Sequence, residues 1–276
     1  MRITSIVLFL LIAFPGAAQR PETENIVIVT LDGLRWQELF AGADPKIAFN
    51  KDYVSTPDII DRFWAHSESE RRQKLMPFLW KVVANKGQLY GNRALRNRVN
   101  CTNNHLISYP GYSELLVGFN DKKVSSNRKI LNPNSTVLEA IAADYRFHDE
   151  VAAFATWDAF NYILREETSG IYVNAGSDVA TGDISLQERL LNKVHRGGRR
   201  TDSLTFAYAM EYLKRVRPRV TLISMGATDH QAHRGNYDKY LEAAHEIDAR
   251  IAELWGWLQQ QPDYQGKTTL FIATDH

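Results

Sequence analysis

The chain has 276 residues, of which 44% are hydrophobic and 24% charged, and its formal net charge is +1 at pH 7. This length suffices for one large α/β domain or two small domains, each with its own core. Positive and negative side chains nearly balance, so the chain lacks the excess of basic residues that proteins binding a nucleic-acid polymer have. Cys101 is the single cysteine, so no intrachain disulfide can form, and we expect it to be a small buried apolar residue.

The first twenty residues have the three parts of a secretory signal peptide. Arg2 provides a positive charge, an apolar run of nine residues extends from Ile6 to Phe14, and small residues precede a suitable cleavage point after Ala18. Such a run is too short to span a bilayer, which needs roughly 20 residues. We therefore expect a signal peptide over residues 1–18, export to the periplasm or the exterior, and no stable membrane anchor after cleavage. A buried N-terminal strand or helix is the alternative.

Short apolar runs rich in β-branched residues alternate along the chain with segments of helical periodicity. This alternation predicts βαβ units around a mostly parallel sheet. In chain order, we expect strand 26–31, helix 76–87, a helix with Pro110 in its first turn, helix 134–144, strand 150–158, helix 202–216, strand 220–225, helix 236–261 and strand 267–276. The polar segments 46–72 and 168–200 are less regular, and we expect them to lie outside the sheet as insertions or lids.

Three aspartates each lie just beyond the carboxyl end of an expected strand: Asp32, Asp229 and Asp275. The carboxyl ends of parallel strands share one edge of a sheet, and ligands bind at that edge. Three carboxylates brought together there repel each other unless a cation neutralises them. His233 follows Asp229 by four residues, and His276 follows Asp275 directly. Carboxylates with histidines suit zinc, manganese or another divalent ion, whereas each aspartate alone would be an ordinary turn or cap residue.

The segment LISYPGYSELLVG places Ser108 just before an expected helix start at Pro110. A hydroxyl at the start of a helix, where backbone N–H groups point outward, is placed to meet a phosphate group. A metal ion bound to its oxygen would lower the pKa of the hydroxyl and make it a nucleophile. Taken alone, Ser108 would be a helix cap, and Ser113, one turn inside the helix, is the poorer nucleophile.

Together these residues resemble the alkaline phosphatase superfamily, most closely its phosphodiesterase and nucleotide pyrophosphatase-like branch or its secreted bacterial phosphatases. The resemblance runs from about Asn25 to His276 and consists of four blocks, VTLDGLRW, TNNHLISYPGYSELLVG, TDHQAHRGNYD and ATDH. In that family a Thr or Ser nucleophile precedes an aromatic residue and Pro, as Ser108 does here. An Asp-x-x-x-His motif comes later in the chain, as in Asp229 and His233.

The resemblance implies a three-layer α/β/α sandwich with a mostly parallel sheet over residues 19–276, and a site for two zinc ions or other divalent metals. The first ion would be held by Asp32, Ser108, Asp275 and His276. The second would be held by Asp229, His233 and one further histidine. In the family that histidine comes well after the Asp-x-x-x-His motif, and none follows His276. We therefore expect a chain cut short at its C-terminus, with an incomplete second zinc site and impaired activity.

The implied reaction is hydrolysis of a small phosphorylated substrate, by a phosphatase or a phosphodiesterase. Ser108 would attack phosphorus, and water would then hydrolyse the phosphoserine. Family members often place an asparagine some twenty residues after the nucleophile, against a phosphate oxygen, and Asn127 is the nearest match, with Asn132 second. Either could equally be an ordinary loop residue. Further positive charge could come from Arg35, Arg128 and Lys129, unless these are solvated surface residues.

Other activities stay open at this point. Sulfate esters are disfavoured, because the sulfatase branch needs an arginine at the fifth position of C/S-x-P-x-R and SYPGY lacks it. A non-catalytic binding domain with the same fold is one alternative to the hydrolase. A phosphomutase or phosphonate hydrolase of the same superfamily is another. The sequence does not indicate an oligomeric state.

Overall fold

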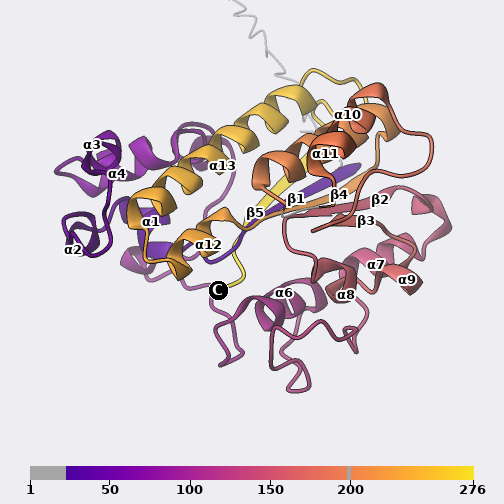
Figure 1. Cartoon of the computed structure of the whole chain (residues 1–276), viewed down its shortest axis with the longest axis horizontal. Helices are drawn as coiled ribbons and strands as arrows, with labels where there is room; N and C mark the ends of the chain where they lie inside the picture. The colour runs from indigo at the N-terminus through magenta and orange to yellow at the C-terminus, as the bar shows by residue number, and fades with distance from the viewer. Residues whose placement is uncertain (1–22, 198–199) are drawn as a thin grey trace, which may run out of the picture.

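A parallel sheet lies at the centre of the protein (Figure 1), whose computed structural model describes residues 23–197 and 200–276. Its strands are β1 (Asn25–Leu31), β2 (Val151–Ala155), β3 (Tyr172–Ala175), β4 (Val220–Met225) and β5 (Thr268–Ala273). They lie in the order β3-β2-β4-β1-β5, and every neighbouring pair is parallel. The expected α/β fold with a parallel sheet is confirmed.

Helices cover both faces of the sheet (Figure 1). On one face lie α11 (Asp202–Val216) and α13 (Tyr237–Leu258), and on the other lie α6 (Ser108–Val117), α7 (Val137–Ala142) and α8 (Phe160–Ile163). Side chains alternate along β1. Val27 and Val29 belong to the hydrophobic core beneath α11 and α13, whereas Ile28 packs against the core beneath α6, α7 and α8. This arrangement is consistent with a three-layer α/β/α sandwich.

Shorter helices join these elements. They are α1 (Trp36–Ala41), α2 (Pro45–Ala48), α3 (Pro57–Phe63), α4 (Glu68–Leu75), the π-helix η1 (Leu79–Val83), α5 (Ala84–Lys86), the 3₁₀ turns η2 (Arg93–Leu95) and η3 (Tyr145–Phe147), α9 (Glu166–Ser169), α10 (Leu186–His195) and α12 (Ala227–His233). Over the described residues, no helix combines the length and the apolar character needed to cross a membrane.

Most elements fall where the sequence predicts them. Helix 202–216 and strand 220–225 have the expected bounds. The strand predicted over 150–158 ends earlier, at Ala155. The helix predicted around Pro110 begins at Ser108, and the long helix predicted to reach Pro262 ends at Leu258.

The prediction that residues 168–200 lie outside the sheet is wrong, because β3 forms one edge of the sheet within that segment. This strand has only four residues, and one of them, Asn174, is polar although buried. Neither an apolar run nor a clear alternation therefore marks it in the sequence. Segment 46–72 forms helices and no strand, as expected. The predicted signal peptide, residues 1–18, lies outside the described residues.

A buried carboxylate fixes the long helix α13 to the segment that contains η1. Asp248 is 1% exposed, and its two oxygens accept hydrogen bonds from the backbone N–H groups of Phe78, at 2.7 Å, and Leu79, at 2.9 Å. Burial raises the pKa of Asp248 from 3.8 to about 6, although these two bonds oppose the rise. The folded protein therefore binds a proton at Asp248 more tightly than the unfolded chain does.

We predict that Asp248→Asn removes a pH-dependent part of the stability. Between the unfolded pKa of 3.8 and the folded pKa of about 6, the folded state keeps a proton that the unfolded chain releases. The contribution of Asp248 to the free energy of unfolding should therefore fall as pH rises, by about 1.4 kcal/mol for each pH unit. Over this whole range the fall amounts to about 3 kcal/mol. Urea unfolding across this pH range measures the fall, with the exposed Asp52→Asn as control. The same pH dependence in Asp248→Asn and the unmodified protein would contradict this.

Candidate functional site

The three predicted aspartates meet at the carboxyl edge of neighbouring strands. Asp32 directly follows β1, Asp275 follows β5, and Asp229 lies in the first turn of α12, which follows β4. Because β1 lies between β4 and β5 in the sheet, these three positions converge. The last residue, His276, lies at the same edge, where the chain end is marked in Figure 1.

His276 lies at the centre of the acidic cluster. Its Nε2 is 3.5 Å from an oxygen of Asp32, 3.7 Å from one of Asp275 and 3.8 Å from one of Asp229. Potential ligand atoms of Asp32, Asp275 and His276 all lie within 4.8 Å of one another. The Ser108 hydroxyl donates to Asp32 Oδ1 at 3.2 Å and lies 3.5 Å from His276 Nε2. All four residues predicted for the first metal ion are thus brought together.

The second predicted pair is more open. His233 Nε2 lies 3.4 Å from Asp229 Oδ2, and the His233 side chain is 78% exposed. The four-residue spacing within α12 places both side chains on one face of that helix. Because Asp229 also approaches His276, this pair borders the first cluster. The arrangement therefore extends from the buried Asp275 to a solvent-accessible histidine.

A glycine turn makes this convergence sterically feasible. Gly33 has φ +62°, and a Cβ at this position would lie 3.1 Å from both Cβ and Oδ1 of Asp229. The Gly33 N–H also donates to Asp275 Oδ1 at 3.1 Å. The hydroxyl of Thr228, beside Asp229, donates to the Asp32 carbonyl oxygen. The turn after β1 therefore contacts both other acidic elements, and only glycine fits it without strain.

Helix α6 brings the serine to the cluster through its first turn. Ser108 is the first helical residue and is 7% exposed. Gly111 packs so closely on Asp275 that a Cβ there would lie 2.4 Å from the Asp275 carbonyl oxygen. The fully buried Tyr112 accepts a hydrogen bond at 3.2 Å from Ser224 on β4. These contacts fix the serine relative to the strands that position the aspartates.

The carboxylates and the imidazole of the cluster shift each other's protonation. Burial and the charge of Asp32 raise the pKa of Asp275 well above its usual value, and the same two causes raise the pKa of Asp229. The hydrogen bond to Asp32 raises the pKa of His276 to about 9, against the opposing effect of burial. Among the described residues, Asp275 Oδ2 is buried without a hydrogen-bond partner. The two carboxylates of Asp32 and Asp275 and the imidazole of His276 are ligand types that fit a divalent cation such as zinc.

The asparagines have different positions relative to the serine. Asn127 is exposed, and its Oδ1 accepts a hydrogen bond at 2.9 Å from the N–H of Tyr109, the residue after Ser108. Asn132 is 1% exposed, and its amide donates to Ser113 and to the Ile163 carbonyl. Asn127 is thus placed beside Ser108, whereas Asn132 supports the fold.

Two of the predicted cations have acidic partners. Arg35 pairs with the buried Glu38 in the first turn of α1, and Lys129 pairs with Asp158. Arg128 is exposed and donates to the Ser126 hydroxyl. The charges of Arg35 and Lys129 are therefore partly neutralised by their ion pairs, and Arg35 has a structural role.

Cys101 is a residue of the site that the sequence did not identify. It is half-buried rather than a core residue, and its thiol donates to the Asp275 carbonyl oxygen at 2.8 Å. Burial, together with the charges of Glu114 and Asp275, raises the pKa of the thiol. The same carbonyl contacts Gly111, so two separate segments hold Asp275 in place. No sequence signal connects Cys101 with a residue 174 positions later.

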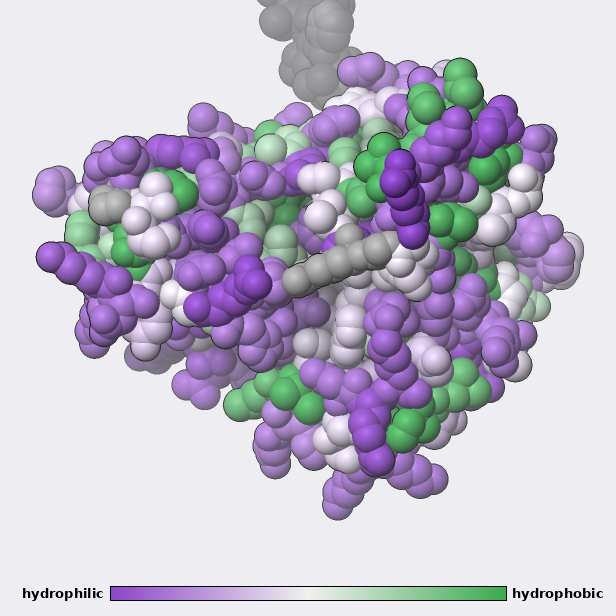
Figure 2. Space-filling model, viewed as in Figure 1, coloured by the Kyte–Doolittle hydropathy of each residue, from purple (hydrophilic) through white to green (hydrophobic). Residues whose placement is uncertain are grey.

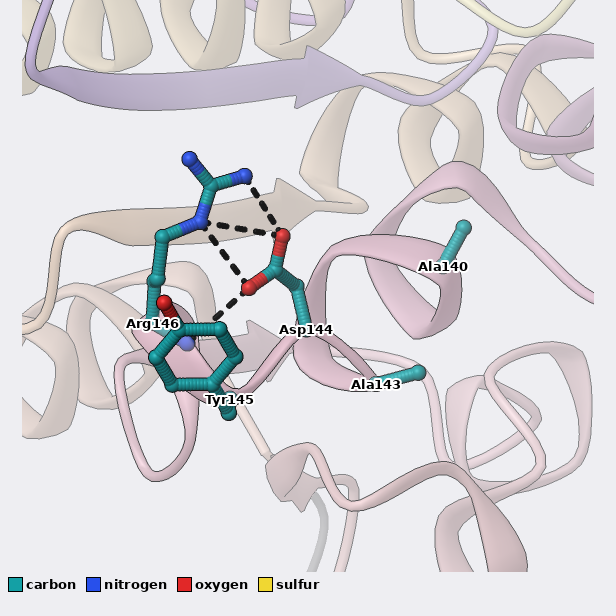
Figure 3. A pocket seen from close by; sticks show the side chains of 5 residues that line it. All are labelled: Ala140, Ala143, Asp144, Tyr145 and Arg146. Atoms are coloured by element: carbon teal, nitrogen blue, oxygen red, sulfur yellow. Dashed lines mark hydrogen bonds and ion pairs between the residues drawn. The ribbon is translucent and has the colours of Figure 1, made fainter.

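A cavity elsewhere in the protein offers no comparable chemistry. It has a volume of about 600 Å³ and is lined by Ala140, Ala143, Asp144, Tyr145 and Arg146. Figure 3 shows that its two charged side chains, Asp144 and Arg146, bond to each other, with the closest pair of atoms at 2.6 Å. Its lining residues come just before β2 in the chain, so the cavity lies near the amino ends of the strands, opposite the edge where the aspartates meet.

Comparisons of the chain with protein-family models, with curated proteins and with solved structures find no match.

We predict that Asp275→Asn affects stability in opposite ways without and with metal. Without metal, the change removes a buried charge beside Asp32, so the free energy of unfolding at pH 8 should rise by roughly 1–3 kcal/mol. With Zn²⁺ at a hundredfold excess over its dissociation constant, the unmodified protein should gain about 2.7 kcal/mol, and the variant much less. Thermal unfolding with chelator and with Zn²⁺ measures both effects. Equal stabilisation of the two proteins by Zn²⁺ would exclude Asp275 as a ligand.

We also predict that Gly111→Ala destabilises the protein, because its Cβ would overlap the Asp275 carbonyl and force α6 away from β5. The free energy of unfolding should fall by about 1–3 kcal/mol, as in other overpacked sites. Gly256 in α13 is a matched control, since a Cβ there meets no atom within 4 Å. Gly256→Ala should stabilise by about 0.5–1 kcal/mol through helix propensity. Urea unfolding compares the two variants, and equal effects would contradict the close approach of α6 to Asp275.

Proposed function

We propose that the protein is an exported, metal-dependent phosphate-ester hydrolase of the alkaline phosphatase superfamily, acting as a phosphatase or a phosphodiesterase. One observation carries the proposal: the Ser108 hydroxyl, in the first turn of a helix, lies 3.2 Å from Asp32 within a cluster of acidic groups from three neighbouring strands. A nucleophile beside a cation site at the carboxyl edge of a parallel sheet suits phosphoryl transfer.

The donor groups divide into two sets that suit two metal ions. Asp32, Asp275, His276 and the Ser108 hydroxyl would hold one ion, and Asp229 with His233 would contribute to the other. Zinc is the favoured ion because carboxylate and imidazole ligands predominate. When bound, the ions would supply positive charge that lowers the pKa of the serine hydroxyl and stabilises charge on the phosphate oxygens.

Ser108 would act as the nucleophile. Its Oγ already donates to Asp32, which orients the hydroxyl and favours loss of its proton. A bond from Oγ to phosphorus would form as the bond to the leaving oxygen breaks. The leaving oxygen would take up a proton, and water would then hydrolyse the bond between Oγ and phosphorus, releasing phosphate from a monoester or a phosphomonoester from a diester and restoring the serine hydroxyl.

The start of α6 would receive the phosphate group. Helix N-termini favour anions because their first N–H groups have no helical partner. In α6 the Tyr109 N–H is bonded to Asn127, the Gly111 N–H is bonded to the Ile107 carbonyl and Pro110 has no N–H, so the Ser108 N–H is the one that would meet a phosphate. Asn127 accepts from the Tyr109 N–H through its Oδ1, so its amide nitrogen is the group that would contact a phosphate oxygen. The loop before α6 is fixed by Glu114, whose carboxylate accepts bonds from Thr102 and Asn103. These residues would hold the substrate and the nucleophile in a common frame.

We predict that Ser108→Ala lowers hydrolysis of p-nitrophenyl phosphate and bis(p-nitrophenyl) phosphate by about a thousandfold or more, because no other hydroxyl can replace the nucleophile. Comparing the two substrates distinguishes a phosphatase from a phosphodiesterase. Ser113→Ala is the matched control, since this buried serine of α6 accepts a bond from Asn132 and should keep turnover within about threefold.

All proteins should be assayed in the presence of Zn²⁺. Circular dichroism should first show that each variant is folded like the unmodified protein. Trapping of a phosphoserine in the unmodified protein, and its absence from Ser108→Ala, would support the mechanism. Undiminished turnover in Ser108→Ala would exclude the assigned nucleophile. Zinc binding without hydrolysis of any phosphate ester would instead favour a binding domain.

A further inference from the structure

Helix α10 exposes a stripe of apolar side chains to solvent. Leu186, Leu190 and Val194 are 61%, 49% and 71% exposed, and their spacing of four residues aligns them along the helix. At 3.6 residues per turn the three side chains span about 80° of the helix surface. We call these three residues the α10 stripe. Exposed apolar side chains are common singly, but an aligned row on one helix indicates a binding surface.

The opposite face of α10 is bound to the protein by polar contacts. The buried Glu188 accepts two hydrogen bonds at 2.9 Å from Arg215 on α11. Asn192 exchanges two bonds with the backbone of Ala180, and the buried His195 bonds the Gly176 carbonyl at 2.9 Å. Because breaking these contacts would leave buried polar groups unsatisfied, the helix cannot turn its stripe inward.

A row of exposed cations lies beside the stripe. It consists of Arg189, Lys193 and Arg196. On a helical projection Arg189 and Lys193 lie about 40° apart, next to the apolar residues, and Arg196 caps the C-terminal end of the helix, so the outward side combines apolar and basic side chains. Figure 2 shows green hydrophobic surface interleaved with purple hydrophilic surface where α10 lies. Glu188 points inward to Arg215, which leaves Asp183 as the exposed acid of residues 181–197.

We propose that α10 docks the protein reversibly on an anionic lipid surface. Apolar side chains that enter the interface, with lysine and arginine beside them, are the two features that interfacial helices use. The basic row complements the negative potential of phosphate headgroups. Such peripheral binding needs no spanning segment and is independent of the chemistry at Ser108.

The same charges disfavour a second copy of the chain as the occupant. Packing two α10 stripes against each other would bring the two basic rows close together, and like charges at an interface oppose association. A lipid surface of opposite charge avoids this repulsion. The outward charge of residues 181–197 is three cations minus one exposed acid, a net of +2 with histidine neutral.

Flotation of the protein with vesicles tests the proposal. One set of vesicles contains phosphatidylcholine with 30% phosphatidylglycerol and is anionic, and the other set contains phosphatidylcholine alone. We expect at least tenfold tighter binding to the anionic vesicles, weakened by raising NaCl from 50 to 500 mM. The triple variant L186Q/L190Q/V194Q and the double variant R189E/K193E should each lose binding at least tenfold. Glutamine suits exposed helix positions, so the triple variant should fold.

Val137→Gln, which changes a 50% exposed apolar residue of α7, is the matched control and should bind as the unmodified protein does. All variants share the apolar run Ile6–Phe14, so differences between them report α10. Equal binding to both vesicle types, or unchanged binding of the triple variant, would overturn the proposal. Stripe-dependent dimerisation in sedimentation analysis without vesicle binding would also overturn it, in favour of a second copy.

Discussion

The mutual repulsion of three carboxylates is the constraint around which this structure is organised. The strand order places β1 between β4 and β5, and the residues that follow these strands include Asp32, Asp229 and Asp275. Burial and the charge of Asp32 raise the pKa values of Asp275 and Asp229, and the His276 imidazole, whose own pKa is raised to about 9, partly offsets the negative charge. The cores on both faces of the sheet must therefore hold these groups together against their repulsion. Such a cluster is a candidate cation site.

The position of the serine depends on the same frame. Gly111 contacts the Asp275 backbone, and Tyr112 bonds Ser224 on β4, so the first turns of α6 rest on two of the strands that carry the acidic groups. A displacement of α6 would therefore alter its contact with Asp275 as well as the position of Ser108. This coupling fixes the distance between the Ser108 hydroxyl and the acidic cluster, which is the kind of positioning that the proposed catalysis would need.

The sequence predicted those helices and strands that leave a recognisable pattern in consecutive residues. Apolar runs mark β1, β4 and β5, and the aspartates that follow them could be assigned to one edge because parallel strands share direction. It failed at β3, where four residues including a buried asparagine carry no periodic signal. It also could not find the contact of Cys101 with Asp275, since contacts between distant segments depend on how the loops close. The order of the strands was likewise beyond reach, because local patterns do not encode it.

Hydrogen bonding separates the structural carboxylates of this protein from those at the candidate site. Asp202 is buried, and its two oxygens accept N–H bonds from Gly226 and Ala227 at the start of α12. Asp248 is satisfied in the same way by two N–H groups of the segment that contains η1. Asp275 is equally buried, yet its Oδ2 has no hydrogen-bond partner among the described residues, and the His276 imidazole lies near it, at 3.7 Å. Backbone hydrogen bonds therefore account for the burial of Asp202 and Asp248, whereas Asp275 has an oxygen that could still accept a ligand.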